Sequence, residues 1–215
     1  MSTPKLGGFN ALILAGGRGT RLGGEGKAEI VLHGQRLVDR VVAAARKVGA
    51  QRVVVLGPQS AGSKADAVIR EDPPFAGPLA AISAGLGELI GSANSEWSMV
   101  LACDLQRPLA VATALINNFG QRAADGLLLV DAEGHTQWLA GIYRTSALAS
   151  VCEELGENLV NAPVRRALNQ LQLARVPVLD EISKDIDTPQ ALESARQNER
   201  KAMAQHLPPE ALNDW

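Results

Sequence analysis

The chain has 215 residues, a formal net charge of −2, and 46% hydrophobic but only 3% aromatic residues. This length suits one α/β domain, whose core must consist of Ala, Val, Leu and Ile, a composition typical of helices packed on a parallel sheet. A nucleic-acid-binding surface is disfavoured, because it needs a basic stripe that the scattered Lys and Arg residues do not form.

The amino-terminal residues show neither a membrane anchor nor a secretion signal. The first long apolar run, residues 9–15, is too short to span a bilayer, and residues 1–8 lack the charged-then-apolar order of a signal peptide. Cys103 and Cys152 are too few and too widely spaced for a disulfide framework or a metal cluster. We therefore expect a cytoplasmic protein with no membrane partner.

A predicted strand followed by a glycine-rich loop carries the strongest chemical signal. Residues 9–15 predict a buried parallel strand, and the glycines that follow are interleaved with Arg18, Arg21 and Lys27. Backbone N–H groups and cations gathered at the end of a strand are typical of a polyphosphate site. A purely structural turn is the alternative, since glycine supplies positive φ in any irregular loop. Three cations opposed only by Glu25 favour an anion site.

Two well-known phosphate loops do not fit these residues. A Walker A loop needs Ser or Thr after its Gly-Lys pair, but Ala28 follows Lys27. The dinucleotide fingerprint needs a third glycine where this chain has Leu22. A hydride-transferring Rossmann protein is therefore disfavoured.

The rest of the chain alternates predicted strands with predicted helices. Further strands are predicted at residues 30–32, 52–56, 68–70, 97–102, 126–130, 139–143 and 173–179. Helices are predicted at 37–48, 78–89, from about 109, at 145–155 and 163–171, and from Pro189 onward. Gly85 inside a helix indicates close packing of another backbone or a ligand. The alternation predicts a three-layer α/β/α domain with a mostly parallel sheet.

Carboxylates stand where predicted strands end. Asp72 follows the strand at 68–70, and Asp104 comes within two residues of the strand at 97–102. Active groups in open α/β sheets gather beyond the carboxyl ends of the strands, so Asp104 is a candidate metal ligand. The alternative is a cap for the helix near residue 109. Asp187 precedes Thr188-Pro189, an ordinary helix start, and its carboxylate is considered for a second role.

Together these motifs resemble nucleotidyltransferases related to the molybdenum cofactor guanylyltransferases. The resemblance covers about residues 9–200 and rests on Leu14-Ala15-Gly16-Gly17 with Arg21, Gly23 and Lys27, on Asp72 with Gly77-Pro78-Leu79, on Cys103-Asp104 and on Asp187-Thr188-Pro189. It implies a Rossmann-like fold of the nucleotide-diphospho-sugar transferase type in residues 1–200. Residues 201–215 are expected to form a helical tail, either truncated or in contact with a second copy.

The resemblance also implies a reaction and a role for each matched residue. The reaction is transfer of GMP from GTP to the phosphate of molybdenum-bound molybdopterin, with pyrophosphate released and Mg²⁺ as cofactor. Nucleotide-binding roles are implied for Leu14, Ala15, Gly16, Gly17, Lys27, Asp72 and Asp104, catalytic roles for Arg21, Lys27 and Asp104, and metal ligation for Asp104 and, where many relatives have asparagine, Asp187. Arg165 and Arg166 match a basic region near the acceptor, solvated helix surface being the alternative. Molybdoenzyme chaperones or a second copy are expected partners.

Three functions remain open. The first is guanylyl transfer, the second is transfer of another nucleotide or to another phosphorylated acceptor, as in cytidylyl or sugar-phosphate nucleotidyltransferases, and the third is non-catalytic nucleotide binding. Leu-Ala-Gly-Gly in place of Leu-Ala-Ala-Gly resembles the guanylyl branch, and the retained Arg21, Lys27 and Asp104 favour an enzyme. Gly26 and Gln106 depart from the aspartate and proline usual in relatives, which leaves the acceptor's identity open.

Overall fold

The computed structural model is built around a five-stranded sheet and describes residues 7–17, 26–32, 34–62, 64–90, 95–179, 182 and 184–206. In sheet order the strands are β5 (Ala67–Ile69), β4 (Ala50–Leu56), β1 (Phe9–Leu14), β6 (Trp97–Ala102) and β8 (Thr136–Arg144). The first four are parallel, and β8 runs antiparallel to β6. Beside β8, β7 (Gly126–Val130) pairs in parallel with β9 (Leu173–Pro177).

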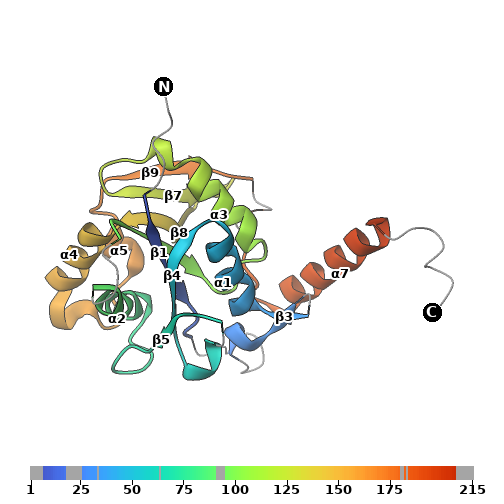
Figure 1. Cartoon of the computed structure of the whole chain (residues 1–215), viewed down its shortest axis with the longest axis horizontal. Coiled ribbons are helices and arrows are strands. Elements are labelled where there is room, and N and C mark those ends of the chain that lie inside the picture. The colour runs from blue at the N-terminus through green and yellow to red at the C-terminus, as the bar shows by residue number, and fades with distance from the viewer. Residues whose placement is uncertain are drawn as a thin grey trace.

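Helices cover both faces of this sheet (Figure 1). On one face lie α1 (Leu37–Lys47) and α3 (Pro108–Asn117); on the other lie α2 (Pro78–Ile90), α4 (Thr145–Leu155) and α5 (Val164–Leu168). Because successive strand residues point to opposite faces, Ala11 and Ile13 pack with the first group of helices and Leu12 and Leu14 with the second. The predicted three-layer sandwich with a mostly parallel sheet is confirmed. None of the described helices is long and apolar enough to cross a membrane.

The carboxyl-terminal helix starts on the domain and then extends away from it (Figure 1). This helix, α7 (Pro189–His206), begins as predicted, with Thr188 Oγ1 accepting a hydrogen bond from Ala191 N at 3.1 Å. Its first turns join a small apolar cluster on the short strand β2 (Val31–Leu32) and on α1, made of Ile30, Leu32, Leu37, Ile186, Leu192 and Ala195. Residues 207–215 lie outside the described ranges, so the division into a domain and a tail stays a prediction.

The structure differs from the predicted elements in several places. The short strand β3 (Gln35–Arg36), which pairs with β2, was missed because two polar residues carry no periodicity. β8 is longer than the strand predicted at 139–143. The Asp131 carboxylate accepts a hydrogen bond from His135 N and so closes the turn before β8, which therefore begins directly after His135. The helix predicted at 163–171 is shorter in the structure, where α5 ends at Leu168 because the chain turns there to enter β9. The strand predicted at 173–179 is shorter too, since β9 ends at Pro177.

Gly85 packs closely against the sheet, as its position inside α2 predicts. A Cβ at this position would lie 2.5 Å from Leu56 Cδ2 and 3.0 Å from Leu12 Cδ2, both in fully buried side chains. Gly87, on the same helix, would meet no atom within 4 Å. The two glycines therefore allow a matched comparison of alanine substitutions, one at a packed position and one at an open position of the same helix.

Gly85→Ala is expected to be less stable than Gly87→Ala by about 1 to 3 kcal/mol, the usual effect of overpacking a core. Gly87→Ala by itself should stabilise the protein by about 0.5 to 1 kcal/mol, because alanine is the better helix former. Urea unfolding of both variants measures the difference. Equal stability of the two would show that Gly85 is not a packing glycine.

Candidate active site

The glycine-rich loop and Asp104 begin at the same edge of the sheet. Cys103 N donates a hydrogen bond to Leu14 O at 2.9 Å, which extends the parallel pairing of β6 with β1 by one residue. Gly16 and Gly17 therefore emerge beside Asp104, as their positions after two strands predict. Cys103 itself is buried, and burial raises the pKa of its thiol, so it is an inert apolar contact and not a nucleophile.

The strand end of β4 supports the loop from its other side. A Cβ on Gly57 would lie 2.9 Å from the carbonyl carbon of Ala15 and 3.1 Å from Gly16 N. Only glycine permits so close an approach of two backbones. Gly57 thus holds the glycine loop in place, at the sheet edge where the sequence predicts that β4 stops.

A segment from the far end of the sequence completes the site. Ile186 N donates to Asp104 O at 2.8 Å, Gln106 N donates to Lys184 O at 2.9 Å, and Leu105 and Asp185 form an antiparallel bridge. Ile186 is fully buried in the cluster beneath α7, which anchors the segment.

Two consequences follow from this pairing. It brings Asp187 to the site, and it uses the N–H of Gln106, a donor that a proline at this position would lack.

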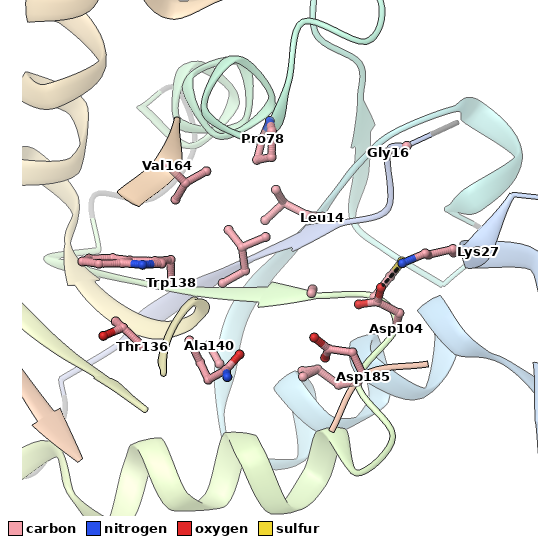
Figure 2. Close-up of a pocket in the computed structure, with 16 residues that line it drawn as sticks. Leu14, Gly16, Lys27, Pro78, Asp104, Thr136, Trp138, Ala140, Val164 and Asp185 are labelled. Atoms are coloured by element: carbon pink, nitrogen blue, oxygen red, sulfur yellow. Dashed lines mark hydrogen bonds and ion pairs between the residues drawn. The ribbon is translucent and has the colours of Figure 1, made fainter. Parts of the chain in front are cut away.

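The Lys27 side chain contacts both Asp104, after β6, and Asp187, in the segment before α7. Its ammonium group donates to Asp104 Oδ2 at 2.7 Å (Figure 2). It also contacts Asp187 Oδ1, so one cation lies between two carboxylates. Ala28, the next residue, is buried in the core and orients the short turn Lys27–Glu29. The alternative of a helix cap for Asp104 is wrong, since α3 has no side-chain cap and the carboxylate is paired with Lys27.

The charges in this cluster shift the acid–base behaviour of its members. Burial disfavours the Lys27 ammonium, but hydrogen bonds and attraction from Asp104 and Asp187 outweigh it and raise the lysine pKa. Asp185, which also faces the pocket, has its pKa raised to about 7 by burial and by the charges of Asp104 and Asp187. Lys27 is therefore a permanent cation within a cluster that is negative overall.

Such a cluster fits a divalent cation shared with a polyphosphate. Among the described residues, no three His, Cys, Asp or Glu side chains are placed to hold a metal by themselves. Mg²⁺ is usually bound by one or two carboxylates together with phosphate oxygens and waters. Asp104 and Asp187 are two such carboxylates, and the Lys27 ammonium between them marks a position where a cation is favourable. Without a further cation, the negative cluster would repel a triphosphate.

A pocket of about 550 Å³ opens beside this cluster. Figure 2 shows Lys27, Asp104 and Asp185 at one end and Trp138 and Val164 at the other. The Trp138 carbonyl accepts a hydrogen bond from the buried Tyr143 hydroxyl at 2.6 Å, which fixes this part of β8. The pocket thus has a charged end and an apolar end with a flat aromatic ring.

A second pocket of about 210 Å³ lies on the other side of the glycine loop. Leu14, Gly16, Gly17 and Pro78 line both pockets, and Glu71 and Phe75 line only the smaller one. The two pockets are therefore neighbours across one short backbone segment. The start of α2 at Pro78 directs the positive end of the helix dipole to both.

The structure brings some predicted residues to these pockets and not others. Leu14, Gly16, Gly17, Lys27 and Asp104 line the larger pocket, and Ala15 is buried directly behind them. Asp72 is exposed, and Arg165 and Arg166 are exposed on α5; none of these three lines either pocket. Arg21 lies outside the described residues.

Among the residues that line the pockets, Glu71, Asp185 and Trp138 are polar or aromatic side chains that the sequence analysis did not assign to the site. Glu71 follows a strand end and could have been found by that signal, whereas Asp185 lies in no predicted element and no motif. Trp138 lies in a strand outside every motif, and its rarity in a chain with 3% aromatic residues was its only signal.

The sheet order gives the chain the nucleotide-diphospho-sugar transferase fold, which it shares with solved structures such as a putative glucose-1-phosphate thymidylyltransferase of Bacillus anthracis, with a TM-score of 0.68 at 11% identity, covering 93% of this chain and 96% of its own. The sequence narrows this assignment further. The model of the MobA-like NTP transferase domain matches residues 11–181, well over half of the chain, so the protein belongs to this family. The resemblance identified from the motifs is confirmed.

Named relatives agree with this assignment. A probable molybdenum cofactor guanylyltransferase of Opitutus terrae is 30% identical over 175 residues, 79% of this chain and 84% of the relative. A molybdenum cofactor guanylyltransferase of Pseudomonas fluorescens is 32% identical over 123 residues, 56% of this chain but only 58% of the relative. The solved molybdopterin-guanine dinucleotide biosynthesis protein A of Archaeoglobus fulgidus has a TM-score of 0.65 at 22% identity, covering 89% of this chain and 99% of its own.

Proposed function

We propose that the protein transfers GMP from GTP to the phosphate of molybdenum-bound molybdopterin, forming the guanine dinucleotide cofactor and releasing pyrophosphate. The observation that carries this proposal is the Lys27 ammonium held between Asp104 and Asp187, directly beside the Gly16–Gly17 backbone. Family membership and the guanylyltransferase relatives support the choice of reaction.

The proposed reaction needs alignment and charge neutralisation, not a covalent nucleophile. A phosphate oxygen of the acceptor attacks the α-phosphorus of GTP, and the bond to the bridging oxygen of pyrophosphate breaks. Gly16 and Gly17 offer backbone N–H groups to the phosphates, and Lys27 offsets the negative charge that develops on the leaving group. Asp104, with Asp187 as second ligand, would hold Mg²⁺, which when bound neutralises further phosphate charge.

The apolar end of the larger pocket suits the acceptor. The pterin of molybdopterin contains a planar pyrimidine ring, and Trp138 offers a flat aromatic surface beside Val164. The acceptor phosphate would then point to the Lys27 end (Figure 2). Arg165 and Arg166, one turn away from Val164 at most, remain proposed partners of the acceptor, and Asp72 and Arg21 remain proposed partners of GTP.

The setting of the reaction is also part of the proposal. We infer a cytoplasmic enzyme that hands its product to molybdoenzyme chaperones or acts as a homo-oligomer. The outward course of α7 is compatible with a contact to another chain (Figure 1).

GTP with Mg²⁺ is expected to stabilise the protein more than CTP, UTP or ATP does. A ligand present at 100 times its dissociation constant contributes about 2.7 kcal/mol, which a thermal-shift assay detects easily. Stabilisation by CTP or UTP but not by GTP would reject guanylyl transfer and favour a cytidylyl or sugar-phosphate enzyme. Binding of GTP without turnover of molybdopterin would favour a non-catalytic role.

A further inference from the structure

A groove of about 890 Å³ lies between α1, α3 and the start of α7, and it shares no lining residue with the two pockets of the candidate active site. Leu109 on its edge is 38% exposed, so apolar surface faces water there. The apolar residues that line the groove are Ala43, Ala44, Pro108, Leu109, Ala110, Ala114, Ile182 and Ala195. An apolar groove between two helices is a common docking site for a peptide segment.

The charged residues of this groove are all basic. Arg40 and Lys47 on α1 and Arg107 before α3 line it, and the described residues that do so include no Asp or Glu. The whole chain, by contrast, has a formal net charge of −2. Arg40 is held in place, because its Nη2 donates to Gln106 O at 2.9 Å. The groove therefore favours an occupant that is both apolar and acidic.

Residues 207–215, which follow α7 and lie outside the described ranges, have this composition. Their sequence is Leu-Pro-Pro-Glu-Ala-Leu-Asn-Asp-Trp, with two acidic and no basic residues. Leu207, Leu212 and Trp215 are its large apolar residues, and tryptophan is one of the residues most enriched among the anchors of interfaces. The segment therefore complements the groove in charge and in apolar content.

The same segment is long enough to return to the groove of its own chain. Ala195 lines the groove, and the rest of α7, from Ala195 to His206, is about 16 Å long at 1.5 Å per residue. Residues 207–215 span up to about 30 Å when extended, which exceeds this length. A segment tethered in this way acts at an effective concentration in the millimolar range, so its own groove is favoured over that of a second copy at micromolar protein.

We propose that residues 207–215 dock in this groove of the same chain. Their apolar side chains would lie against the alanines of α1 and α3, and their carboxylates beside Arg40, Lys47 and Arg107. Docking would return the chain to the domain after the outward course of α7 (Figure 1). The contact uses no residue of the proposed reaction, so it can fail while guanylyl transfer stands.

Acrylamide quenching of Trp215 fluorescence in the full chain tests this proposal. The signal of Trp215 is the difference between the wild type and Trp215→Phe, since Trp97 and Trp138 are present in both. A dissociation constant of about 100 µM, against a millimolar effective concentration, would leave about one segment in ten undocked. Quenching should then be about tenfold weaker than in a synthetic peptide of residues 207–215. Quenching equal to that of the peptide would overturn the proposal.

Lys47→Glu tests where the segment docks. Reversing one charge in the groove is expected to weaken docking about tenfold and so to raise the quenching of Trp215 about fivefold. Lys64→Glu, the same change at an exposed lysine outside the groove, should leave quenching as in the wild type. Both lysines are exposed, so both variants should keep the melting temperature of the wild type. Protection of Trp215 that Lys47→Glu does not reduce would place the segment elsewhere and overturn the proposal.

The dependence on protein concentration separates a chain's own groove from that of a second copy. Quenching of Trp215 should stay constant between about 1 and 100 µM protein, because docking within one chain does not depend on concentration. Protection that appears only as the concentration rises would assign the groove to the segment of a second copy, and docking within one chain would be wrong.

Discussion

Replacing Asp104 by Asn is expected to reduce guanylyl transfer by at least about 10²-fold while the protein stays folded. Asparagine keeps the size of the side chain but removes the charge that would attract Mg²⁺ and that pairs with Lys27 at 2.7 Å. Lys27 still has Asp187 as a partner, so the change in stability should be small. Turnover and melting temperature are measured on the same preparation, and excess Mg²⁺ or Mn²⁺ should restore only part of the activity.

Asp66→Asn is the matched control for this experiment. Asp66 accepts a hydrogen bond from Val53 N at 2.7 Å and pairs with Arg46 at 2.9 Å, away from both pockets. Its variant should lose up to about 1 kcal/mol of stability and keep its turnover, the opposite of the Asp104 result. An active and well-folded Asp104→Asn protein would show that this carboxylate is not a metal ligand.

Replacing Lys27 by Met is expected to lower turnover by about 10² to 10³-fold, because a preorganised cation on a developing phosphate charge is typically worth that much. Methionine keeps much of the aliphatic stem, so packing over the buried Ala28 should survive. A second effect follows from the geometry. Without the ammonium, Asp104 and Asp187 face each other unneutralised, so Mg²⁺ alone should raise the melting temperature of the variant more than that of the wild type.

Lys64→Met removes an exposed lysine away from both pockets and should leave turnover and the response to Mg²⁺ unchanged. Turnover of Lys27→Met within twofold of the wild type would remove this lysine from the proposed mechanism. A Mg²⁺ response equal to that of the wild type would show that the two carboxylates do not share a cation.

The sequence by itself determined the layers of the fold and the edge of the sheet at which the site lies. Apolar strands alternating with amphipathic helices bury a parallel sheet, and the ends of parallel strands necessarily meet at one edge. For this reason the Gly16–Gly17 loop and Asp104 could be assigned to a common site from local pattern alone, and the structure places them side by side. The structural role of Gly85 was predictable in the same way, since glycine weakens a helix interior and is tolerated there where a larger side chain would not fit.

Only the tertiary structure decided which side chains meet. Lys27 is 77 residues from Asp104 and 160 from Asp187, and their contact depends on the bridge between Leu105 and Asp185, which no periodicity encodes. The choice between Glu71 and Asp72 was equally out of reach, because loop geometry after a strand decides which of two adjacent carboxylates turns into the pocket. Local pattern assigns residues to an edge of the sheet, whereas the direction of each side chain is determined by contacts between segments far apart in the chain.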